Sequence, residues 1–491
     1  MQPRRSVSRF LAVCLFGGLV SCGKGADRTR PTSELTVRVG VAQLAINQPT
    51  EGLPQISQLF SAEGLVRPAA DGRLLPQIAE SLTPSSDGRT LTVQLKPSVQ
   101  FHDGSPLDAS TVAAALNDSL RAYMGPVFVE IDRIESIGQR QVAIHFKQSS
   151  VLLREALEAP LQKVGKGPVS TGPYSVVPGS TTDMESNKSY YLGRPLIDRI
   201  RVENYPNVRA AWADLLRERI DVLYEVGPDA MDSMKDSKTA SLFMITRPFQ
   251  HVIVFNPAAR QLTAKVRRAL SYAIDRPAIV QQGLRSYGVP SEGPLWPKYW
   301  AVPAEMRGFS FDPRRAAELL GPSKPSLRFT CLVAPDSIDE RIALEVKRQL
   351  AAIDVDMNVE GVSREEIFKR ASSGEFEAAA VERISGPTAF RPYLVWHSNA
   401  PFNFGKFGSR TLDAALDRMK DASDEPSMRA AVLGAHQAFM DDPPAIFLAW
   451  SVRARAVSNR FVIPPLEPGR DVLATLRLWH LSADNRYASR N

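Results

Sequence analysis

Apolar and polar residues alternate along several short stretches of the chain, and this pattern predicts strands with one buried face. The first stretch covers residues 35–44, where every second residue from Leu35 to Val41 is apolar. A second stretch covers residues 90–95, where Leu91, Val93 and Leu95 alternate with polar residues. The sequence therefore predicts a strand soon after residue 34 and another near residue 90.

Residues 327–362 combine the two-residue alternation of strands with the spacing of three to four residues that is typical of helices. The alternation of residues 327–333 predicts a strand, and residues 354–362 alternate again. Between them the apolar residues follow a helical spacing on one stripe, at Ile342, Val346, Leu350 and Ile353. Helices and short strands alternate in this way along much of the chain, which indicates an α/β class.

Residues 85–116 carry turn and cap signals around a strand. Asp87-Gly88 and His102-Asp103-Gly104 predict turns on either side of it. Asp108 is placed to cap a helix, and Val112 and Leu116 lie four residues apart on one face of that helix.

The first 22 residues have the three-part layout of a secretory signal peptide. Three arginines (Arg4, Arg5 and Arg9) precede an apolar stretch, residues 10–20, which is too short to span a bilayer. Ser21 is small, and Leu19-Val20-Ser21-Cys22 resembles the bacterial lipobox, whose cysteine is acylated. We expect residues 1–21 to be the signal peptide and residues 22–34 to be a lipidated polar tether. The alternative is an ordinary cleaved signal followed by a chance cysteine.

Cysteine usage and charge narrow the picture further. Cys14 would leave with the signal and Cys22 would carry lipid, so only Cys331 remains, on the expected buried face of a strand. No intramolecular disulfide is then possible. The formal charge of +7 falls to +4 without the three signal-peptide arginines, and no basic tract is clustered, so a nucleic-acid partner is not expected.

Motifs for catalysis or metal binding are not apparent in the sequence. It has no His-Glu-x-x-His, no Gly-x-Ser-x-Gly and no Walker A loop. The six histidines are scattered, and His102 and His397 are more typical of structural residues than of metal ligands. We expect a protein that is not an enzyme and has no catalytic residues, cofactor or metal, although an exported hydrolase is the enzyme alternative.

Several blocks of motifs follow one another between residues 63 and 280. The strongest runs from Asp87-Gly88 through Phe101-His102-Asp103-Gly104 to the helix start at residues 107–112. The other blocks are residues 63–82, 170–177, 190–202, 217–226 and 255–280. In content and order these blocks resemble the extracytoplasmic solute-binding proteins of family 5, which serve importers of peptides, nickel and oligosaccharides.

This resemblance implies a fold and a domain organisation. It implies the periplasmic-binding-protein-like α/β architecture, with two α/β lobes around a hinged cleft and an inserted extra domain, three lobes in all. Lobe I is expected at residues 35–48, 165–248 and 452–491, the inserted domain II at 49–164 and lobe III at 249–451. Two crossing strands, near residues 249–256 and 445–452, would join the lobes and act as the hinge.

The resemblance also implies a function and partners. It implies a lipid-anchored, monomeric binding protein of an ABC importer, in the periplasm or at the cell surface. Such a protein captures a peptide-like solute by cleft closure and delivers it to a permease with separate ATPase subunits. The alternatives are a ligand-binding sensor lipoprotein and a binder of oligosaccharides or other organic solutes.

Two regions are expected to contact the ligand. Tyr224 and Glu225 follow the Ile-Asp-Val block on a loop that in this family looks across the cleft, and Trp450 lies at the second crossing, where it is either a ligand contact or a core residue. In lobe III, peptide-binding members of the family carry an aspartate that pairs with the peptide amino group. The corresponding residues 381–399 contain no aspartate.

An unpaired ammonium in a closed cleft would be costly, so the acid has moved or the ligand has changed. Glu382 is the candidate for a displaced acid, whereas Arg383 and Arg391 favour an anionic or blocked end unless they are solvated surface residues. The predicted ligand contacts of this stretch and its continuation are Glu382, Arg383, Ser385, Arg391, Trp396, Phe402 and Phe404. We expect a peptide-like ligand whose binding depends only weakly on a free amino terminus.

Overall fold

A sheet of eleven strands is the centre of the computed structural model, which describes residues 34–42, 52–163, 165, 169–321 and 327–482. By their contacts, the described residues from Leu35 onward form one unit. The predicted signal peptide, Cys22 and nearly all of the predicted tether lie outside the described residues. In order across the sheet, the strands are β15 (Asp356–Gly361), β14 (Arg328–Val333), β16 (Ala378–Ile384), β12 (Ala240–Phe255), β17 (Ala445–Ser458), β11 (Val222–Val226), β1 (Thr36–Ala42), β10 (Arg199–Tyr205), β9 (Asp183–Ser186) and β8 (Tyr174–Val176), with β13 (Gly288–Pro290) paired to β17.

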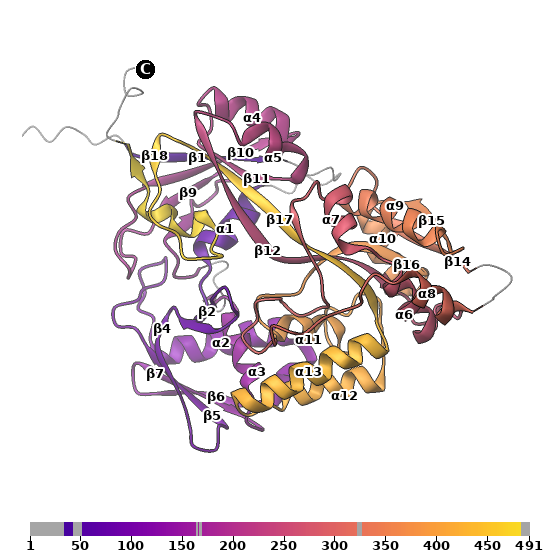
Figure 1. The fold of residues 1–491 in the computed structure, drawn as a ribbon. Coiled ribbons are helices and arrows are strands. Elements are labelled where there is room, and N and C mark those ends of the chain that lie inside the picture. Colours follow the sequence, from indigo (N-terminus) through magenta and orange to yellow (C-terminus); the bar gives the residue numbers. More distant parts are fainter. Residues whose placement is uncertain (1–33, 43–51, 164, 166–168, 322–326, 483–491) are drawn as a thin grey trace, which may run out of the picture. The chain divides into compact units, whose positions relative to one another are not determined.

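Two long antiparallel strands, β12 and β17, cross the centre of Figure 1. At one end they join β11 and its neighbours, and at the other end they join β16 and its neighbours. The sequence predicted crossing strands at residues 249–256 and 445–452. The observed strands are longer because β12 begins at Ala240 and β17 continues to Ser458.

On the two sides of this crossing, the short strands run toward each other. The strands β1, β10 and β11 are parallel, and β11 ends at Val226, which pairs with Ala454 of β17. On the other side β14, β15 and β16 are parallel, and β16 ends at Ile384, which pairs with Phe249 of β12. Both sets therefore direct their carboxyl ends at the middle of the crossing strands.

Helices cover both halves of the sheet (Figure 1). Beside the first half lie α1 (Gly52–Ser61), α4 (Val208–Leu216), α5 (Pro228–Met234) and η3 (Val472–Leu478). Beside the second half lie α6 (Ala264–Tyr272), α7 (Arg276–Gly283), α8 (Pro313–Leu320), α9 (Ile338–Ala351) and α10 (Arg364–Ser373). The helices α11 (Phe390–Trp396), α12 (Arg410–Lys420) and α13 (Glu425–Asp441) lie next to α3 (Val151–Arg154) of the segment between β1 and β8 (Figure 1). Two short strands, β18 (Phe461–Val462) and β19 (His480–Leu481), pair separately.

The segment between β1 and β8 forms its own four-stranded antiparallel sheet. Its strands lie in the order β4 (Ala79–Pro84), β5 (Thr90–Leu95), β7 (Gln141–Phe146) and β6 (Ile131–Ile137). The other elements of this segment are the pair β2 (Val66–Pro68) and β3 (Leu74–Pro76), with α2 (Ala109–Met124), η1 (Gly125–Glu130), α3 (Val151–Arg154) and η2 (Glu155–Glu158). The predicted helix start is confirmed, because the Asp108 side chain accepts a hydrogen bond of 2.8 Å from the backbone N–H of Thr111.

The predicted buried faces are present. Leu91, Val93 and Leu95 are buried on β5, and Cys331 is fully buried on β14, where burial raises the pKa of its thiol to about 12. One boundary was wrong. The helix that carries Ile342, Val346 and Leu350 ends at Ala351, so Ile353 packs against the same core from the turn that follows.

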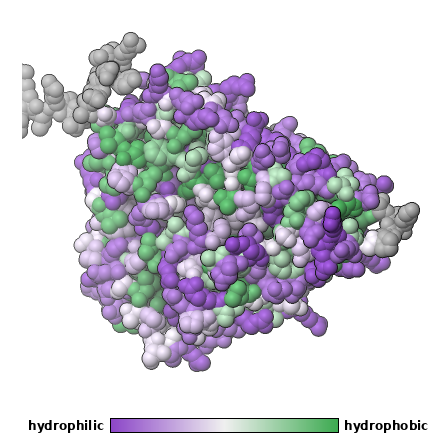
Figure 2. Space-filling view, in the orientation of Figure 1, coloured by the Kyte–Doolittle hydropathy of each residue, from purple (hydrophilic) through white to green (hydrophobic). Residues whose placement is uncertain are grey.

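The surface that Figure 2 shows is mostly hydrophilic. Hydrophobic side chains gather at the upper left of that view, over the part labelled β9, β18 and α1 in Figure 1. In the described ranges, no helix has both the length and the apolar content that a membrane span requires.

Candidate functional site

Four charged side chains meet where the carboxyl ends of β11 and β16 face the crossing strands. Glu225 lies on β11 and Glu382 on β16, whereas Arg247 lies on β12 and Arg453 on β17. We call these four residues the charge cluster. In α/β sheets ligands bind outside the carboxyl ends of the strands, so the cluster lies where a ligand is expected.

Each arginine of the charge cluster contacts both glutamates. The Arg453 guanidinium lies 3.4 Å from a Glu225 oxygen and 3.5 Å from a Glu382 oxygen. Arg247 Nη1 lies 3.6 Å from Glu225 Oε1 and 3.7 Å from Glu382 Oε2. The side chains of Arg247, Glu225 and Glu382 are 22%, 18% and 17% exposed, so the cluster is largely buried but open to solvent on one side.

The regular ladder of the sheet is interrupted beside these residues. Between β11 and β17 the register shifts between Leu223 and Val226, at the position of Glu225. Between β12 and β17 it shifts between Thr246 and Gln250, at the position of Arg247. In a regular strand, successive side chains point to opposite faces of the sheet. A break in the register changes the direction in which a side chain points, and such breaks are frequent next to functional sites.

A buried histidine extends the cluster toward α9. His251 is 1% exposed, and its Nδ1 lies 2.7 Å from Asp339 Oδ1 at the start of α9. Its Nε2 lies 3.8 Å from Glu382 Oε1. Among the described residues, His251 Nε2 and Glu382 Oε1 are buried atoms without a hydrogen-bond partner. Buried polar atoms are normally paired, so these two atoms are exceptions that need an explanation.

The electrostatics of the cluster keep Glu382 ionised. Burial by itself raises the pKa of a carboxyl, but the surrounding side chains of His251, Arg247, Arg453 and Ser451 together outweigh burial and lower the pKa of Glu382 to about 2. The cluster therefore presents carboxylates and guanidinium groups together at neutral pH.

Tyr224 lies beside the cluster on β11. The guanidinium of Arg455 lies 4.0 Å from the centre of the Tyr224 ring, donates a hydrogen bond to the Tyr224 carbonyl, and pairs with Asp471 at 2.7 Å. The sequence placed Tyr224 and Glu225 on a loop, and this was wrong. Both are within a strand because β11 continues to Val226.

Ion pairs also join the two sides of the crossing farther out. Asp229, at the start of α5, pairs with Arg341 of α9 at 2.6 Å and with Arg285 at 2.7 Å. Tyr287 donates a hydrogen bond of 2.8 Å to Asp232 of α5. These contacts hold the first half of the structure against the second half at the rim of the site.

The stretch after β16 is tied to the inserted segment. Glu158 of η2 accepts hydrogen bonds from Arg391 Nε at 2.8 Å and from the Tyr123 hydroxyl at 2.7 Å. Ser385 is buried, and its hydroxyl donates to the carbonyl of Pro294 at 2.6 Å. Arg391 and Ser385 therefore have partners within the protein, and their roles as ligand contacts stay predictions.

Arg383 differs from Arg391. In the part of the chain that the structure describes, no carboxylate pairs with Arg383, and burial lowers the pKa of its guanidinium to about 10. The guanidinium lies 5.3 Å from the centre of the Phe404 ring and donates to the Phe402 carbonyl. It points to the opposite face of β16 from Glu382, because neighbouring residues in a strand alternate.

The two predicted tryptophans are packed inside the protein. Trp450 is fully buried, and its ring meets the ring of Trp296 edge-on with centres 5.0 Å apart. Trp396 is also buried and packs edge-on against Phe439 and Phe447. In this conformation both have the surroundings of core residues, so a ligand contact at either position remains a prediction.

Comparison with known proteins identifies the family. The model of the bacterial extracellular solute-binding proteins, family 5, matches residues 73–404. The chain belongs to this family.

Relatives and solved structures agree with this assignment. The glutathione-binding protein GsiB of Pectobacterium atrosepticum is 26% identical over 454 residues, which cover 82% of this chain and 86% of that protein. NikZ of Campylobacter jejuni, solved with Ni(L-His), has a TM-score of 0.76 at 21% identity. The matched region covers 90% of this chain and 99% of the NikZ chain. The oligopeptide-binding protein AppA of Bacillus subtilis, solved with a nonapeptide, has a TM-score of 0.73 at 19% identity. The matched region covers 91% of this chain and 99% of the AppA chain.

These comparisons confirm the α/β periplasmic-binding-protein fold. They also make the chain an extracellular solute-binding protein, in a family of binders that are not enzymes.

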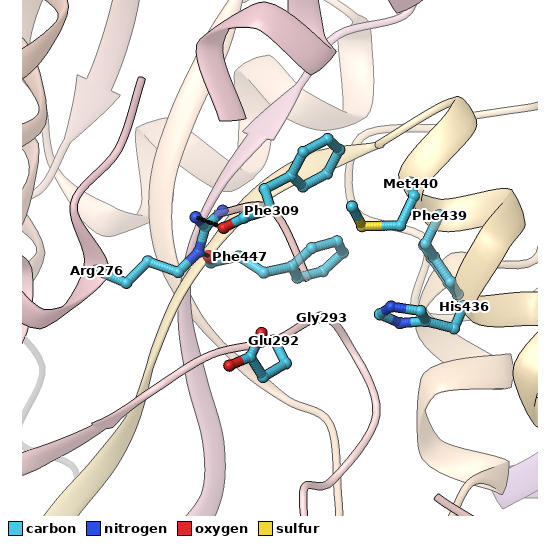
Figure 3. A pocket seen from close by; sticks show the side chains of 8 residues that line it. All are labelled: Arg276, Glu292, Gly293, Phe309, His436, Phe439, Met440 and Phe447. Carbon is cyan, nitrogen blue, oxygen red and sulfur yellow. Dashed lines mark hydrogen bonds between the residues drawn. The ribbon is translucent and has the colours of Figure 1, made fainter. Parts of the chain in front are cut away.

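A separate small pocket of this family 5 protein is shown in Figure 3. It is lined by the apolar side chains of Phe309, Phe439, Met440 and Phe447, and by Arg276, Glu292, Gly293 and His436. The guanidinium of Arg276 is buried and donates to four backbone carbonyls, of Phe447, Ser271, Ile274 and Phe309. These bonds use Nε and Nη1 and tie the side chain to the backbone around the pocket.

The histidines named from the sequence have structural partners. His102 Nε2 lies 3.0 Å from the Gly172 carbonyl, and burial lowers the pKa of the ring. His397 stacks on Tyr393 and lies 3.5 Å from Asp417. Over the described ranges, no group of three or more His, Cys, Asp or Glu side chains is arranged to hold a metal ion.

The sequence reasoning missed five residues of the site. They are Arg247, His251, Asp339, Ser451 and Arg453. One signal was available, because Arg247 and Arg453 are charged residues directly beside the predicted apolar crossings at 249–256 and 445–452. A charge that interrupts a buried strand needs a partner, and this could have marked both positions.

Proposed function

We propose that this protein is the solute-binding component of an ABC importer and captures a peptide-like solute by closing around it. The observation that supports this most is the position of the charge cluster, between two sets of strand ends that face each other across two crossing strands. Small rotations in β12 and β17 would open and close such a site. The domain boundaries expected from the sequence, with lobes joined at these strands, are part of this proposal.

The edge of β16 supports a peptide-like ligand. β14 pairs with β16 at Ala378 and Ala379 only. From Ala380 to Ile384, the edge opposite β12 has no strand partner among the described residues. An extended peptide can add to an open sheet edge through its backbone amides. Glu382 and Arg383 would then lie on either side of the bound chain.

The ligands of related proteins are consistent with this class. GsiB is a glutathione-binding protein, AppA of Bacillus subtilis was solved with a nonapeptide, and NikZ was solved with Ni(L-His). All three ligands contain amino-acid groups. Peptides, glutathione and nickel complexes of amino acids are therefore the candidates for this protein.

A ligand screen tests the proposal. A ligand present at 100 times its dissociation constant stabilises the folded state by about 2.7 kcal/mol, which raises the melting temperature. We expect a shift with at least one of di- to nonapeptide pools, glutathione or Ni(L-His). Oligosaccharides serve as the contrasting class. A shift with oligosaccharides alone would overturn the peptide-like assignment, and no shift with any probe would count against a solute-binding role.

We also propose that Cys22 anchors the protein to a membrane from outside the cytoplasm. Its position after Leu-Val-Ser behind an apolar stretch supports acylation. Two acyl chains hold a protein stably, whereas one holds it only marginally. Cys22→Ala should move the protein from the membrane fraction to the soluble fraction. Retention of the variant in carbonate-washed membranes would refute the anchor, and Cys331→Ala is the matched control that should remain membrane-bound.

A further inference from the structure

The charge cluster has two features that a purely structural ion network does not need. The first is the spacing of its charges. Two other largely buried arginines meet carboxylates directly, in Arg455–Asp471 at 2.7 Å and Arg391–Glu158 at 2.8 Å. In the charge cluster every arginine–glutamate contact is 3.4 Å or longer. Among the described residues, no hydrogen bond joins its arginines to its glutamates, although charge-assisted bonds normally shorten to 2.7–2.9 Å.

The second feature is the balance of its charges. The cluster contains two guanidinium groups and two carboxylates, and each group faces both groups of the opposite sign. A ligand group with one charge would leave this arrangement unbalanced, because it would attract two of the four groups and repel the other two. In a group that carries both charges a bond or two apart, the positive end can face the two carboxylates while the negative end faces the two guanidinium groups.

Unused polar atoms mark the same place. His251 Nε2 and Glu382 Oε1 are buried and have no hydrogen-bond partner among the described residues. The Arg247 side chain forms no hydrogen bond with another described residue, and its guanidinium lies 4.3 Å from the centre of the Phe249 ring. The planar guanidinium is therefore held in place with donors available for a carboxylate.

We propose that the charge cluster binds an α-amino-acid head, that is, an ammonium and a carboxylate on one carbon atom. Glu225 and Glu382 face the ammonium, and Arg247 and Arg453 face the carboxylate. This inference rests on the proposed function and specifies its substrate class. Ordinary peptides carry these two charges at opposite ends, so the ligands selected are peptides linked through a side-chain carboxyl, such as γ-glutamyl peptides, and amino acids themselves.

Isomeric tripeptides separate this subsite from general peptide binding. The probes are γ-Glu-Cys-Gly and α-Glu-Cys-Gly, which have the same composition and net charge, measured by titration calorimetry under reducing conditions. Only the γ-isomer has a free ammonium and a free carboxylate on one carbon. We expect it to bind at least tenfold more tightly. Two truncated probes, glutaryl-Cys-Gly without the ammonium and 4-aminobutanoyl-Cys-Gly without the carboxylate, should each lose at least tenfold.

Substitutions assign the two charges to the two residue pairs. Glu225→Gln should weaken binding of γ-Glu-Cys-Gly at least tenfold and leave glutaryl-Cys-Gly unaffected or improved. Arg247→Gln should weaken γ-Glu-Cys-Gly similarly and leave 4-aminobutanoyl-Cys-Gly unaffected. Arg348→Gln on the exposed face of α9 is the control and should change neither. If a variant does not fold, as judged by its melting transition without ligand, Glu225→Asp or Arg247→Lys replaces it.

The outcomes separate the two proposals. Equal or tighter binding of α-Glu-Cys-Gly, or equal losses of every probe in both variants, would overturn the amino-acid-head subsite while peptide binding stands. Binding of none of these tripeptides, with binding of longer α-peptides, would overturn the subsite in the same way. If no peptide binds, and neither glutathione nor Ni(L-His) binds, the proposed function would be overturned, and the subsite with it.

Discussion

Glu155 offers a quantitative test of how the inserted segment supports the stretch after β16. Its side chain is 2% exposed and accepts hydrogen bonds from the Tyr299 hydroxyl at 2.7 Å and from the backbone N–H of Phe390 at 2.8 Å. Burial raises the pKa of Glu155 to about 8, because these two bonds only partly offset the loss of water and the charge of Glu158 adds to the rise. The carboxyl is therefore neutral in the folded protein at pH 7.

The sign of the effect on stability follows from this pKa. The unfolded chain loses the proton near the ordinary value of 4.5, and the folded protein keeps it until about 8. The contribution of Glu155 to the free energy of unfolding is therefore fully present below pH 4.5, and it is lost as the pH rises to about 8. At about 1.36 kcal/mol per pKa unit, the difference between 4.5 and 8 corresponds to a loss of about 5 kcal/mol.

Glu155→Gln should remove this loss. The amide keeps an acceptor for Phe390 N–H and can donate to the Tyr299 hydroxyl, so the variant retains both contacts without a titrating group. Urea unfolding of both proteins at pH 4.5, 6, 7 and 8.5 measures the difference in free energy of unfolding. We expect the variant to gain about 5 kcal/mol on the wild type across this range.

Glu365→Gln, at an exposed carboxyl of α10, is the control and should show no such trend. A difference between wild type and Glu155→Gln that stays constant with pH would refute the reasoning. It would mean that Glu155 is ionised in the folded protein and that solvent or a cation reaches it.

Three further substitutions test the fold and the closure of the site. Asp108→Ala removes the cap of α2 and should lower the free energy of unfolding by about 1 kcal/mol; an unchanged value in urea unfolding would argue against the cap. Asp229→Asn removes the rim ion pairs with Arg341 and Arg285, which are partly exposed and contribute up to about 1 kcal/mol. Calorimetry should then show a severalfold weaker ligand affinity, and an unchanged affinity would show that the rim does not contribute to closure. Arg276→Met removes the side-chain hydrogen bonds to four backbone carbonyls and should cost about 3 kcal/mol or more in urea unfolding, whereas Arg276→Lys should cost less; equal costs would contradict this account.

The sequence by itself determined the elements whose cause is local. The alternation of Leu91, Val93 and Leu95 predicted β5, and Asp108 predicted the start of α2, because strand periodicity and helix caps depend on residues a few positions apart. The crossing strands were also predicted, from two apolar alternating runs, although their ends were not. The α/β class and the family followed from the order of such elements and motifs along the chain.

The candidate site was only partly predictable. Glu225 and Glu382 were named because they lie in stretches that resemble family motifs, and the structure places them in one cluster. Arg391 was named with them, but its guanidinium is paired with Glu158, which is more than 200 residues earlier in the chain. Nothing near Arg391 in the sequence indicates this partner.

Only the tertiary structure decided that four charges from four strands lie together. Arg247, Glu225, Glu382 and Arg453 are distant in sequence, and each by itself is a common surface residue type. Their convergence depends on two shifts in strand register, which arise from the pairing of whole strands and not from any short motif. Charges interact through space at distances of a few ångströms, so the chemistry of this site exists only once the sheet has formed.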